Sequence, residues 1–341
     1  MKKVLVTGGC GFIGHHIIEH LIKNTDWDVK VVDKLTYASN GFDRLRDINV
    51  FDDKRVQVYT NDFSEKFSEG MERELINIDY ILHVGAETHV DKSIENPAPF
   101  VKSNVEGTMH MLDFARKQNN LERFVYFSTD EVFGPAYGKT LFKEGDRHNP
   151  GNPYAASKSG AEALCISYAN TYKMPIIITN TMNAFGERQN PEKYIPKTII
   201  DVLKGEKVIV HSDPTKTIAG SRFYIHCRNI ADALLFILNK PNETLDIHDA
   251  TKGKFNIVGE KEVDNLELAK FIAKTLGKEL KYEMVDFHSS RPGHDLRYGL
   301  DGSKLRAMGF EYPKTFEQSL EKTIKWYLEN PKWLGLSQKS L

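Results

Sequence analysis

Short apolar runs rich in β-branched residues alternate with amphipathic stretches through the first half of the chain. Buried strands are predicted at residues 3–7, 29–33, 56–60, 80–84, 124–128 and 176–180. Helices are predicted between them at residues 12–23, 65–76, 101–117 and 154–172. Buried strands that alternate with helices indicate a parallel sheet covered on both faces, with right-handed crossovers. The pattern therefore predicts an α/β fold with a doubly wound, Rossmann-type parallel sheet.

The alternation becomes irregular in the second half, where proline and glycine interrupt it at 190–196, 213–220 and 290–293. We expect residues 1–182 to form the Rossmann domain and residues 183–341 to form most of a smaller, mixed α/β lobe. Two segments are expected to return to the sheet, near 223–238 and 254–258. Two further helices are predicted in the lobe, at 266–276 and 316–327.

Composition and charge exclude several classes of function. The 341 residues carry 46 Lys and Arg against 47 Asp and Glu, so the formal net charge is −1. Nucleic-acid and membrane-surface binding both need a basic excess, so neither partner is expected. No apolar run approaches the ~18 residues of a membrane span, and Met1 is followed almost at once by the first predicted strand, without a signal-peptide pattern. Cys10, Cys165 and Cys227 show no metal-ligand spacing, so we expect reduced thiols, no metal and a cytoplasmic location.

Three glycines follow the first predicted strand. Gly8, Gly11 and Gly14 have GxxGxxG spacing, and Phe12 and Ile13 begin the first predicted helix. Glycines in this context allow a tight turn, a close approach of backbone to a pyrophosphate, and close packing of helix on strand. A glycine triplet alone could be turn punctuation, but the strand before it and the helix after it favour a dinucleotide site.

Acidic residues at the ends of the next strands suit the adenosine half of a dinucleotide. Asp33 ends the second predicted strand, 33 − 14 = 19 residues after Gly14. A carboxylate there accepts the ribose hydroxyls and repels a 2′-phosphate, which predicts NAD rather than NADP. The alternatives are that Asp33 caps a turn and that Lys34 tolerates a phosphate. Asp62, after the third strand, is placed for the adenine amino group or is a plain loop residue.

Tyr154 and Lys158 lie four residues apart and so share one face of a predicted helix. A lysine ammonium beside a phenol lowers the pKa of the phenol, as does a positively charged nicotinamide ring. The pair then suits removal of a hydroxyl proton while a hydride leaves the same carbon. In isolation such a pair could be an exposed feature of a helix. Downstream of the glycine motif, we interpret it as catalytic.

A second reactive segment follows the strand predicted at 124–128. Thr129 is placed to donate a hydrogen bond to the oxygen that Tyr154 deprotonates. Asp130 and Glu131 form an adjacent acidic pair that hydride transfer alone does not need. Two neighbouring carboxylates in a partly dry cleft have pKa values pushed apart, which gives one acid and one base. A capping carboxylate in a turn would explain one acid but not two.

With these motifs in place, the chain resembles the nucleotide-sugar 4,6-dehydratases, a group of extended short-chain dehydrogenases/reductases, along nearly its whole length. The resemblance rests on the Thr-Asp-Glu triplet and on segments at 33–38, 83–93, 104–108, 191–196 and 291–298. The triplet is its most specific mark, because related epimerases and decarboxylases lack the acid pair.

The resemblance implies a cycle in which NAD takes up a hydride and gives it back. Tyr154, with Lys158 and Thr129, would take the proton of the sugar O4 hydroxyl while hydride leaves C4. Glu131 would then remove the C5 proton and Asp130 would protonate the departing C6 hydroxyl. Hydride returning to C6 would complete a 4-keto-6-deoxy sugar nucleotide.

The remaining expected contacts also follow from the resemblance. The cofactor is expected to contact Thr36 and Phe63 besides the residues above. The nucleoside-diphosphate sugar is expected to contact Thr88, Asn183, Lys193, Arg222, Asn256, Arg291 and His294. The two arginines suit a diphosphate because a guanidinium presents forked donors. For each of these residues a solvated surface or capping role is the alternative. A homodimer is expected to pair through the helices at 101–117 and 154–172.

Some residues depart from the group's usual pattern. Glu187 stands where proline is common, and His226 begins a segment in which an aromatic–acidic signature is expected. The loop at 211–220 is longer than usual and carries Lys216. These departures lie toward the sugar-nucleotide pocket and leave the substrate base open. A 4-epimerase or a decarboxylase, a dehydratase that returns hydride elsewhere, and a non-catalytic NAD(H) sensor are the alternative functions.

Overall fold

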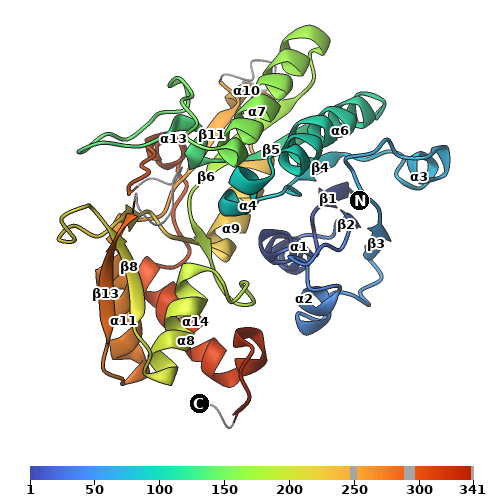
Figure 1. The fold of residues 1–341 in the computed structure, drawn as a ribbon. Helices are drawn as coiled ribbons and strands as arrows, with labels where there is room; N and C mark the ends of the chain where they lie inside the picture. The colour runs from blue at the N-terminus through green and yellow to red at the C-terminus, as the bar shows by residue number, and fades with distance from the viewer. Residues whose placement is uncertain (246–251, 288–295, 339–341) are drawn as a thin grey trace.

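The computed structural model describes residues 1–245, 252–287 and 296–338, and its centre is a seven-stranded sheet (Figure 1). The strand order is β3-β2-β1-β4-β5-β6-β11, and every neighbouring pair is parallel. The strands are β1 (Lys3–Thr7), β2 (Asp28–Asp33), β3 (Val56–Thr60), β4 (Tyr80–His83), β5 (Arg123–Thr129), β6 (Ile176–Thr181) and β11 (Lys254–Ile257). The order reverses between β1 and β4, so ligands are expected at the carboxyl ends of these strands. The predicted doubly wound α/β class is confirmed.

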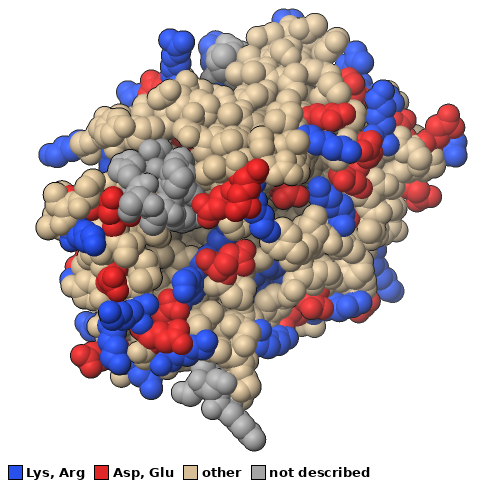
Figure 2. Space-filling view, in the orientation of Figure 1, with Lys and Arg blue, Asp and Glu red and all other residues tan. Residues whose placement is uncertain are grey.

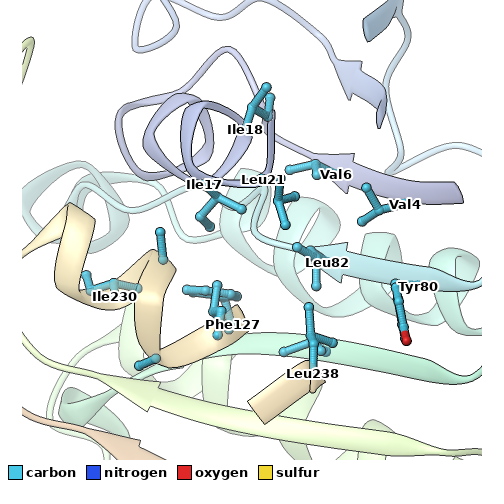
Figure 3. Close-up of a cluster of buried hydrophobic side chains, with 14 of the residues drawn as sticks. Val4, Val6, Ile17, Ile18, Leu21, Tyr80, Leu82, Phe127, Ile230 and Leu238 are labelled. Carbon is cyan, nitrogen blue, oxygen red and sulfur yellow. The ribbon is translucent and has the colours of Figure 1, made fainter. Parts of the chain in front are cut away.

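Helices cover both faces of the sheet because successive residues of each buried strand point to opposite sides. Val4 and Val6 lie in one hydrophobic cluster, and Leu5 lies in the other. Figure 3 shows the first cluster, in which α1 (Phe12–Asn24) and α9 (Cys227–Leu238) pack on strands β1, β4 and β5. The second cluster joins the opposite face to α6 (Gly107–Arg116) and α7 (Pro153–Tyr172).

The helix predicted at 101–117 is interrupted at its start. Val101–Glu106 form a π-helical segment that leads into α6. There the side chain of Asn104 exchanges hydrogen bonds with the backbone of Glu87 (2.8 and 2.9 Å) and donates to the hydroxyl of Ser157 (2.9 Å). The wider π-helical turn lets Asn104 contact both the loop after β4 and helix α7. The hydrophobic spacing of the segment does not indicate such a turn.

The smaller lobe combines three two-stranded sheets with helices. The strand pairs are β7 (Ala184–Phe185) with β10 (Ile225–His226), β8 (Val208–Ser212) with β13 (Tyr282–Asp286), and β9 (Ser221–Arg222) with β12 (Val263–Asp264). The first two pairs are parallel and the third is antiparallel. Helices α8 (Tyr194–Lys204), α11 (Asn265–Leu276) and α14 (Phe316–Glu329) share a separate hydrophobic core. Both helices predicted for the lobe are confirmed.

Of the two segments expected to return to the sheet, one does so as a strand. Lys254–Ile257 is β11, at the edge beside β6. Cys227–Leu238 is instead helix α9, which covers the sheet without joining it. Its apolar side chains follow a helical spacing, which gives the helix one face to pack against the sheet.

The remaining elements are short. They are α2 (Asp43–Asp47), α3 (Glu69–Glu74), α4 (Val90–Glu95), α5 (Ala98–Phe100), the 3₁₀ turn η2 (Asp130–Phe133), α10 (Asn242–Leu245), α13 (Ser303–Ala307) and η3 (Pro331–Leu334). Helix α3 is shorter than the predicted 65–76 because Ser68, not Glu65, caps it, accepting a hydrogen bond from the N–H of Met71.

The face of the molecule in Figure 2 is hollowed between the part that holds the sheet and the lobe below it, and acidic and basic side chains intermingle along the hollow. Within residues 1–245, 252–287 and 296–338, no helix has the length and apolar character to cross a membrane. The same residues contain no group of three His, Cys, Asp or Glu side chains arranged to hold a metal ion.

Candidate active site

A glycine turn connects β1 to α1. Gly8 has a φ of +67°, and a Cβ atom there would lie 2.6 Å from the Cα atom of Gly85. Its carbonyl oxygen accepts the N–H of Gly11 at 3.0 Å, which closes the turn. Gly11 is the N-cap of α1 and offers no side-chain acceptor. The first N–H groups of the helix, at Phe12 and Ile13, therefore suit an anion such as a pyrophosphate.

Asp33 ends β2 beside this turn. One carboxylate oxygen accepts the N–H of Cys10 (3.0 Å) and the other accepts the N–H of Leu35 (2.8 Å). Burial raises the pKa of Asp33, although both hydrogen bonds act in the opposite direction. Each carboxylate oxygen has a second lone pair, so the group can still accept ribose hydroxyls.

The other predicted cofactor residues lie around the same strand ends. The ammonium of Lys34 is 3.4 Å from a carboxylate oxygen of Glu87 and 3.8 Å from one of Asp62. Thr36 is half-buried in the loop after β2. The ring of Phe63 is buried in the second hydrophobic cluster. Phe63 therefore leaves only its backbone for the expected cofactor contact.

The Thr-Asp-Glu triplet lies where β5 ends. The hydroxyl of Thr129 donates to a carboxylate oxygen of Asp130 (3.0 Å) and accepts the N–H of Glu131 (3.3 Å). Burial raises the pKa of Asp130 to about 7, with a further rise from the charge of Glu131 and an opposing effect from Arg222. Asp130 can thus hold a proton near neutral pH, which is what a general acid requires.

Helix α7 brings the tyrosine and the lysine to this strand end. Tyr154 is buried, and its phenol hydrogen-bonds the side chain of Thr129. The ammonium of Lys158 donates to the carbonyl oxygen of Phe127 and lies 4.4 Å from the ring centroid of Tyr126. Tyr154 and Lys158 therefore both contact β5 next to the triplet, from the helix face that they share.

The pKa of Tyr154 differs from the expectation that Lys158 lowers it. Burial raises this pKa above its usual value, the charge of Glu131 raises it further, and only the hydrogen bond with Thr129 lowers it. Burial also lowers the pKa of Lys158 to about 7, against the effect of Glu162. The Lys158 ammonium contacts the carbonyl oxygen of Phe127 and the ring of Tyr126. Because the pKa of Tyr154 is raised, the protein groups alone keep its phenol protonated.

The predicted substrate residues divide into two groups. Thr88 and Asn183 are exposed after β4 and β6, and Lys193 is half-buried at the N-terminus of α8. Arg222 donates to the carbonyl oxygens of Ser221 and Leu296, and its charge reaches Asp130. These residues stand on the side of the sheet where the carboxyl ends of the strands meet the lobe. Arg291 and His294 lie outside the described residues.

Asn256, also predicted to contact the substrate, has a buried side chain with partners inside the protein. Its side chain is fully buried on β11, where its amide donates to the carbonyl oxygens of Phe142 and Asp301, both at 3.0 Å. With both N–H bonds used in this way, Asn256 ties two loops to the sheet edge. Its contact with the substrate stays a prediction.

A buried charge network beneath the triplet escaped the sequence analysis. The carboxylate of Glu162 lies 2.9 Å from the ammonium of Lys254 and 3.4 Å from Nε2 of His148. The amide of Asn180 donates both to Glu162 (2.7 Å) and to the carbonyl oxygen of Thr129 (3.3 Å). Burial raises the pKa of Glu162, but the His148 hydrogen bond and the Lys254 charge bring it down to about 2. The network therefore links β11, β6 and α7 to the backbone of the triplet.

One signal for this network was present in the sequence. Glu162 follows Tyr154 by eight residues and Lys158 by four, so all three share a face of α7. Lys254, by contrast, lies 92 residues further along the chain, and no local pattern connects the two.

A comparison with known protein families identifies the family of the chain. A family model described as GDP-mannose 4,6 dehydratase matches residues 5–323. The chain belongs to this family. It is therefore a member of the nucleotide-sugar 4,6-dehydratase group.

Individual relatives agree with this family membership. The chain is 35% identical over 349 residues to the dTDP-glucose 4,6-dehydratase of Neisseria gonorrhoeae, and the match covers 96% of each. It is 34% identical to a trifunctional UDP-glucose 4,6-dehydratase/UDP-4-keto-6-deoxy-D-glucose 3,5-epimerase/UDP-4-keto-L-rhamnose-reductase of Arabidopsis thaliana. That match includes 98% of this chain but 48% of the plant protein, so the chain spans about half its length.

The fold agrees with a solved relative as well. A dTDP-glucose 4,6-dehydratase from Streptomyces venezuelae, crystallised with NAD bound, matches with a TM-score of 0.84 and 33% sequence identity. The match covers 97% of this chain and 98% of that one. The chain and the solved protein therefore share the architecture of both the sheet and the lobe.

Two residues that depart from the usual family pattern contact each other. A carboxylate oxygen of Glu187 lies 2.9 Å from Nε2 of His226, and both side chains are buried. The carbonyl oxygen of Glu187 is 3.1 Å from Nε2 of His16, on α1. The departures form one polar cluster that connects the lobe to the glycine-turn helix, so neither is an isolated change.

We expect Gly14→Ala to weaken binding of NAD and to destabilise the fold. A Cβ atom at this position would lie 2.2 Å from the carbonyl oxygen of Gly8, so the turn has to move. The cost of such overpacking is about 1–3 kcal/mol. Thermal unfolding and calorimetric titration with NAD measure the two effects.

The matched control is Gly160→Ala, where the nearest atom to a Cβ is 3.6 Å away in a regular helix. It should keep NAD affinity and stability. Equal NAD affinity in the two variants would contradict the predicted role of the turn.

We expect Asp130→Asn to stabilise the protein above neutral pH and to slow catalysis about a hundredfold. The folded-state pKa of about 7 is raised by burial, so the stabilising effect of the bound proton is lost as pH rises through 7. Asparagine never ionises, so the variant should gain a few kcal/mol at about pH 8, since one pKa unit corresponds to ~1.4 kcal/mol. The gain should vanish below about pH 4, where aspartic acid is protonated in both states. Urea unfolding at several pH values measures it, and a variant less stable than wild type at pH 8 would refute the raised pKa.

Proposed function

We propose that this chain dehydrates a nucleoside-diphosphate hexose to the 4-keto-6-deoxy sugar with NAD as its cofactor. The observation that carries the proposal is the acidic pair Asp130–Glu131 held against Thr129 and Tyr154 at the end of β5. Oxidation at C4 alone would need Tyr154 and Thr129 but not two further carboxyl groups. Elimination of water across C5 and C6 needs one base and one acid, and the pair supplies both.

The residues that fit NAD lie at the carboxyl ends of β1 and β2. The glycine turn admits a pyrophosphate at the start of α1, and Asp33 accepts ribose hydroxyls. When bound, NAD would accept a hydride from C4 and return it to C6, and its oxidised ring would bring a positive charge to the site. That charge is relevant because the protein groups alone raise the pKa of Tyr154.

Proton movements in the cycle are assigned to three side chains. Tyr154 takes the proton of the O4 hydroxyl, while Thr129 hydrogen-bonds the same oxygen. Glu131 then takes the proton from C5, which the adjacent 4-ketone has made acidic. Asp130 gives its proton to the C6 hydroxyl, which leaves as water. When hydride reaches C6, Glu131 returns its proton to C5. Passage of the O4 proton from Tyr154 to Asp130 then restores both of these groups to their starting states.

The sugar nucleotide is assigned to the lobe side of these groups. Arg222 lies close enough to Asp130 for its charge to lower the pKa of that carboxyl, and it stacks 4.8 Å from the ring centroid of Tyr298. A diphosphate bound by this guanidinium would place a hexose near the triplet. Thr88, Asn183 and Lys193 are further proposed contacts. Pairing of two chains through α6 and α7 stays a prediction.

Product masses test the proposal. Purified protein is incubated with thymidine, uridine, guanosine and cytidine diphosphate hexoses, and each product is analysed by mass spectrometry. We expect one of these substrates to lose one molecule of water. A product of unchanged mass would indicate a 4-epimerase, and no product with any substrate would favour a non-catalytic role.

A further inference from the structure

Asn152 contacts two parts of the candidate site at once. It is the N-cap of α7, and its side-chain oxygen accepts the N–H of Ala155 at 2.8 Å. Its side-chain nitrogen donates to a carboxylate oxygen of Glu131 at 3.0 Å. The residue is only 6% exposed, so both hydrogen bonds form in a largely dry environment. One amide thus joins the start of the helix that carries Tyr154 to the proposed C5 base.

We propose that Asn152 is a positioning residue that orients the Glu131 carboxylate for proton removal at C5. This inference rests on the proposed function, which assigns that step to Glu131. Fixing one carboxylate oxygen restricts the rotation of the group. Because Asn152 also starts α7, Glu131 is held at a set position relative to Tyr154, and oxidation at C4 and proton removal at C5 share one rigid frame.

Helix capping alone does not require an amide at this position. Asparagine, aspartate and serine are about equally good N-caps, because each offers an oxygen to the first N–H groups of a helix. Of these three residues, only asparagine also carries an NH₂ group, which can donate a hydrogen bond while the amide oxygen caps the helix. An aspartate would keep the cap and lose the donor, and it would face Glu131 with a second negative charge.

Among the described residues, η2 and α7 both bring titratable groups to Glu131. Asp130 precedes it on η2, and Tyr154 faces it from α7, and both interact electrostatically with it. Neither group offers a permanent positive charge. The Asn152 amide is thus a neutral donor to a carboxylate that has Asp130 and Tyr154 as neighbours.

Two substitutions separate the cap from the orienting contact. In Asn152→Asp the cap is kept, but a carboxylate beside a second carboxylate is harder to ionise, so less of the base is available at neutral pH. We expect the rate of C5–H exchange with D₂O to fall about tenfold near pH 7 and its acidic limb to move to higher pH by about one unit. Asn152→Ser should keep the cap, lower the exchange rate less, and leave the pH profile in place. Both variants should unfold within a few degrees of wild type.

The Glu131→Gln background separates this inference from the proposed function. If Glu131→Gln alone leaves C5 exchange intact, the assignment of the base is wrong, and the role of Asn152 fails with it. If Glu131→Gln stops exchange but Asn152→Asp keeps the wild-type rate and pH profile, only the positioning role is overturned. Adding Asn152→Asp to Glu131→Gln should lower any residual exchange no further, and an additional tenfold loss would show that Asn152 acts by another route.

Discussion

We expect the Glu131→Gln variant to stop the reaction halfway and to accumulate reduced cofactor. Tyr154 and Thr129 are untouched, so C4 is still oxidised and NADH forms. A glutamine amide cannot accept the C5 proton, and the loss of a positioned base costs about 10²–10⁴ in rate. Absorbance of NADH after addition of the sugar nucleotide should rise to about one equivalent per site and persist, whereas in the wild type it stays low at steady state.

The Tyr154→Phe variant is the matched control, because it removes the other proton acceptor on the same site. Without the phenol, the O4 proton has no acceptor, so the cofactor should stay oxidised and product formation should fall by a similar factor. Asp130→Asn should behave like Glu131→Gln but more mildly. Turnover of Glu131→Gln at the wild-type rate would remove Glu131 from the mechanism.

The second large effect concerns stability: Lys254→Met should cost about 3–5 kcal/mol of unfolding free energy. Lys254 is the cation closest to the fully buried carboxylate of Glu162, at 2.9 Å, and its own side chain is 5% exposed. Removing it leaves a buried negative charge with the partial compensation of His148 and Asn180. Denaturant unfolding at neutral pH measures the change.

Two further variants identify the cause. Lys325→Met removes the lysine of an exposed pair with Glu321 and should change stability by less than about 0.5 kcal/mol. The double variant Glu162→Gln/Lys254→Met carries no buried charge at this position and should regain more than half of the loss. A Lys254→Met protein as stable as Lys325→Met would show that the network does not support the fold.

The sheet and the glycine turn could be predicted because their signals are local. Apolar runs rich in β-branched residues, a helical period between them and the glycine spacing each depend on residues close in sequence. The same reasoning predicted Thr129 at the carboxyl end of its strand, and the four-residue spacing of Tyr154 and Lys158 predicted a shared helix face.

Other features depend on contacts between distant residues or on burial. Lys254 pairs with Glu162, 92 residues earlier in the chain. The amide of Asn256 donates to the carbonyl oxygens of Phe142 and Asp301, which lie in two distant loops. The pKa of Tyr154 could not be inferred from its spacing to Lys158, because burial and the charge of Glu131 raise it. The role of Asn152 required the geometry of its amide, since the sequence indicates only a helix start before Pro153.

Transfer of a labelled hydrogen tests the central claim most directly. The sugar nucleotide that loses water is prepared with deuterium at C4, and the product is analysed by mass spectrometry and NMR. We predict a 4-keto-6-deoxy sugar that is lighter by one water and carries the deuterium at C6. Deuterium kept at C4 in a product of unchanged mass, or lost to the solvent, would contradict an internal hydride shuttle coupled to elimination.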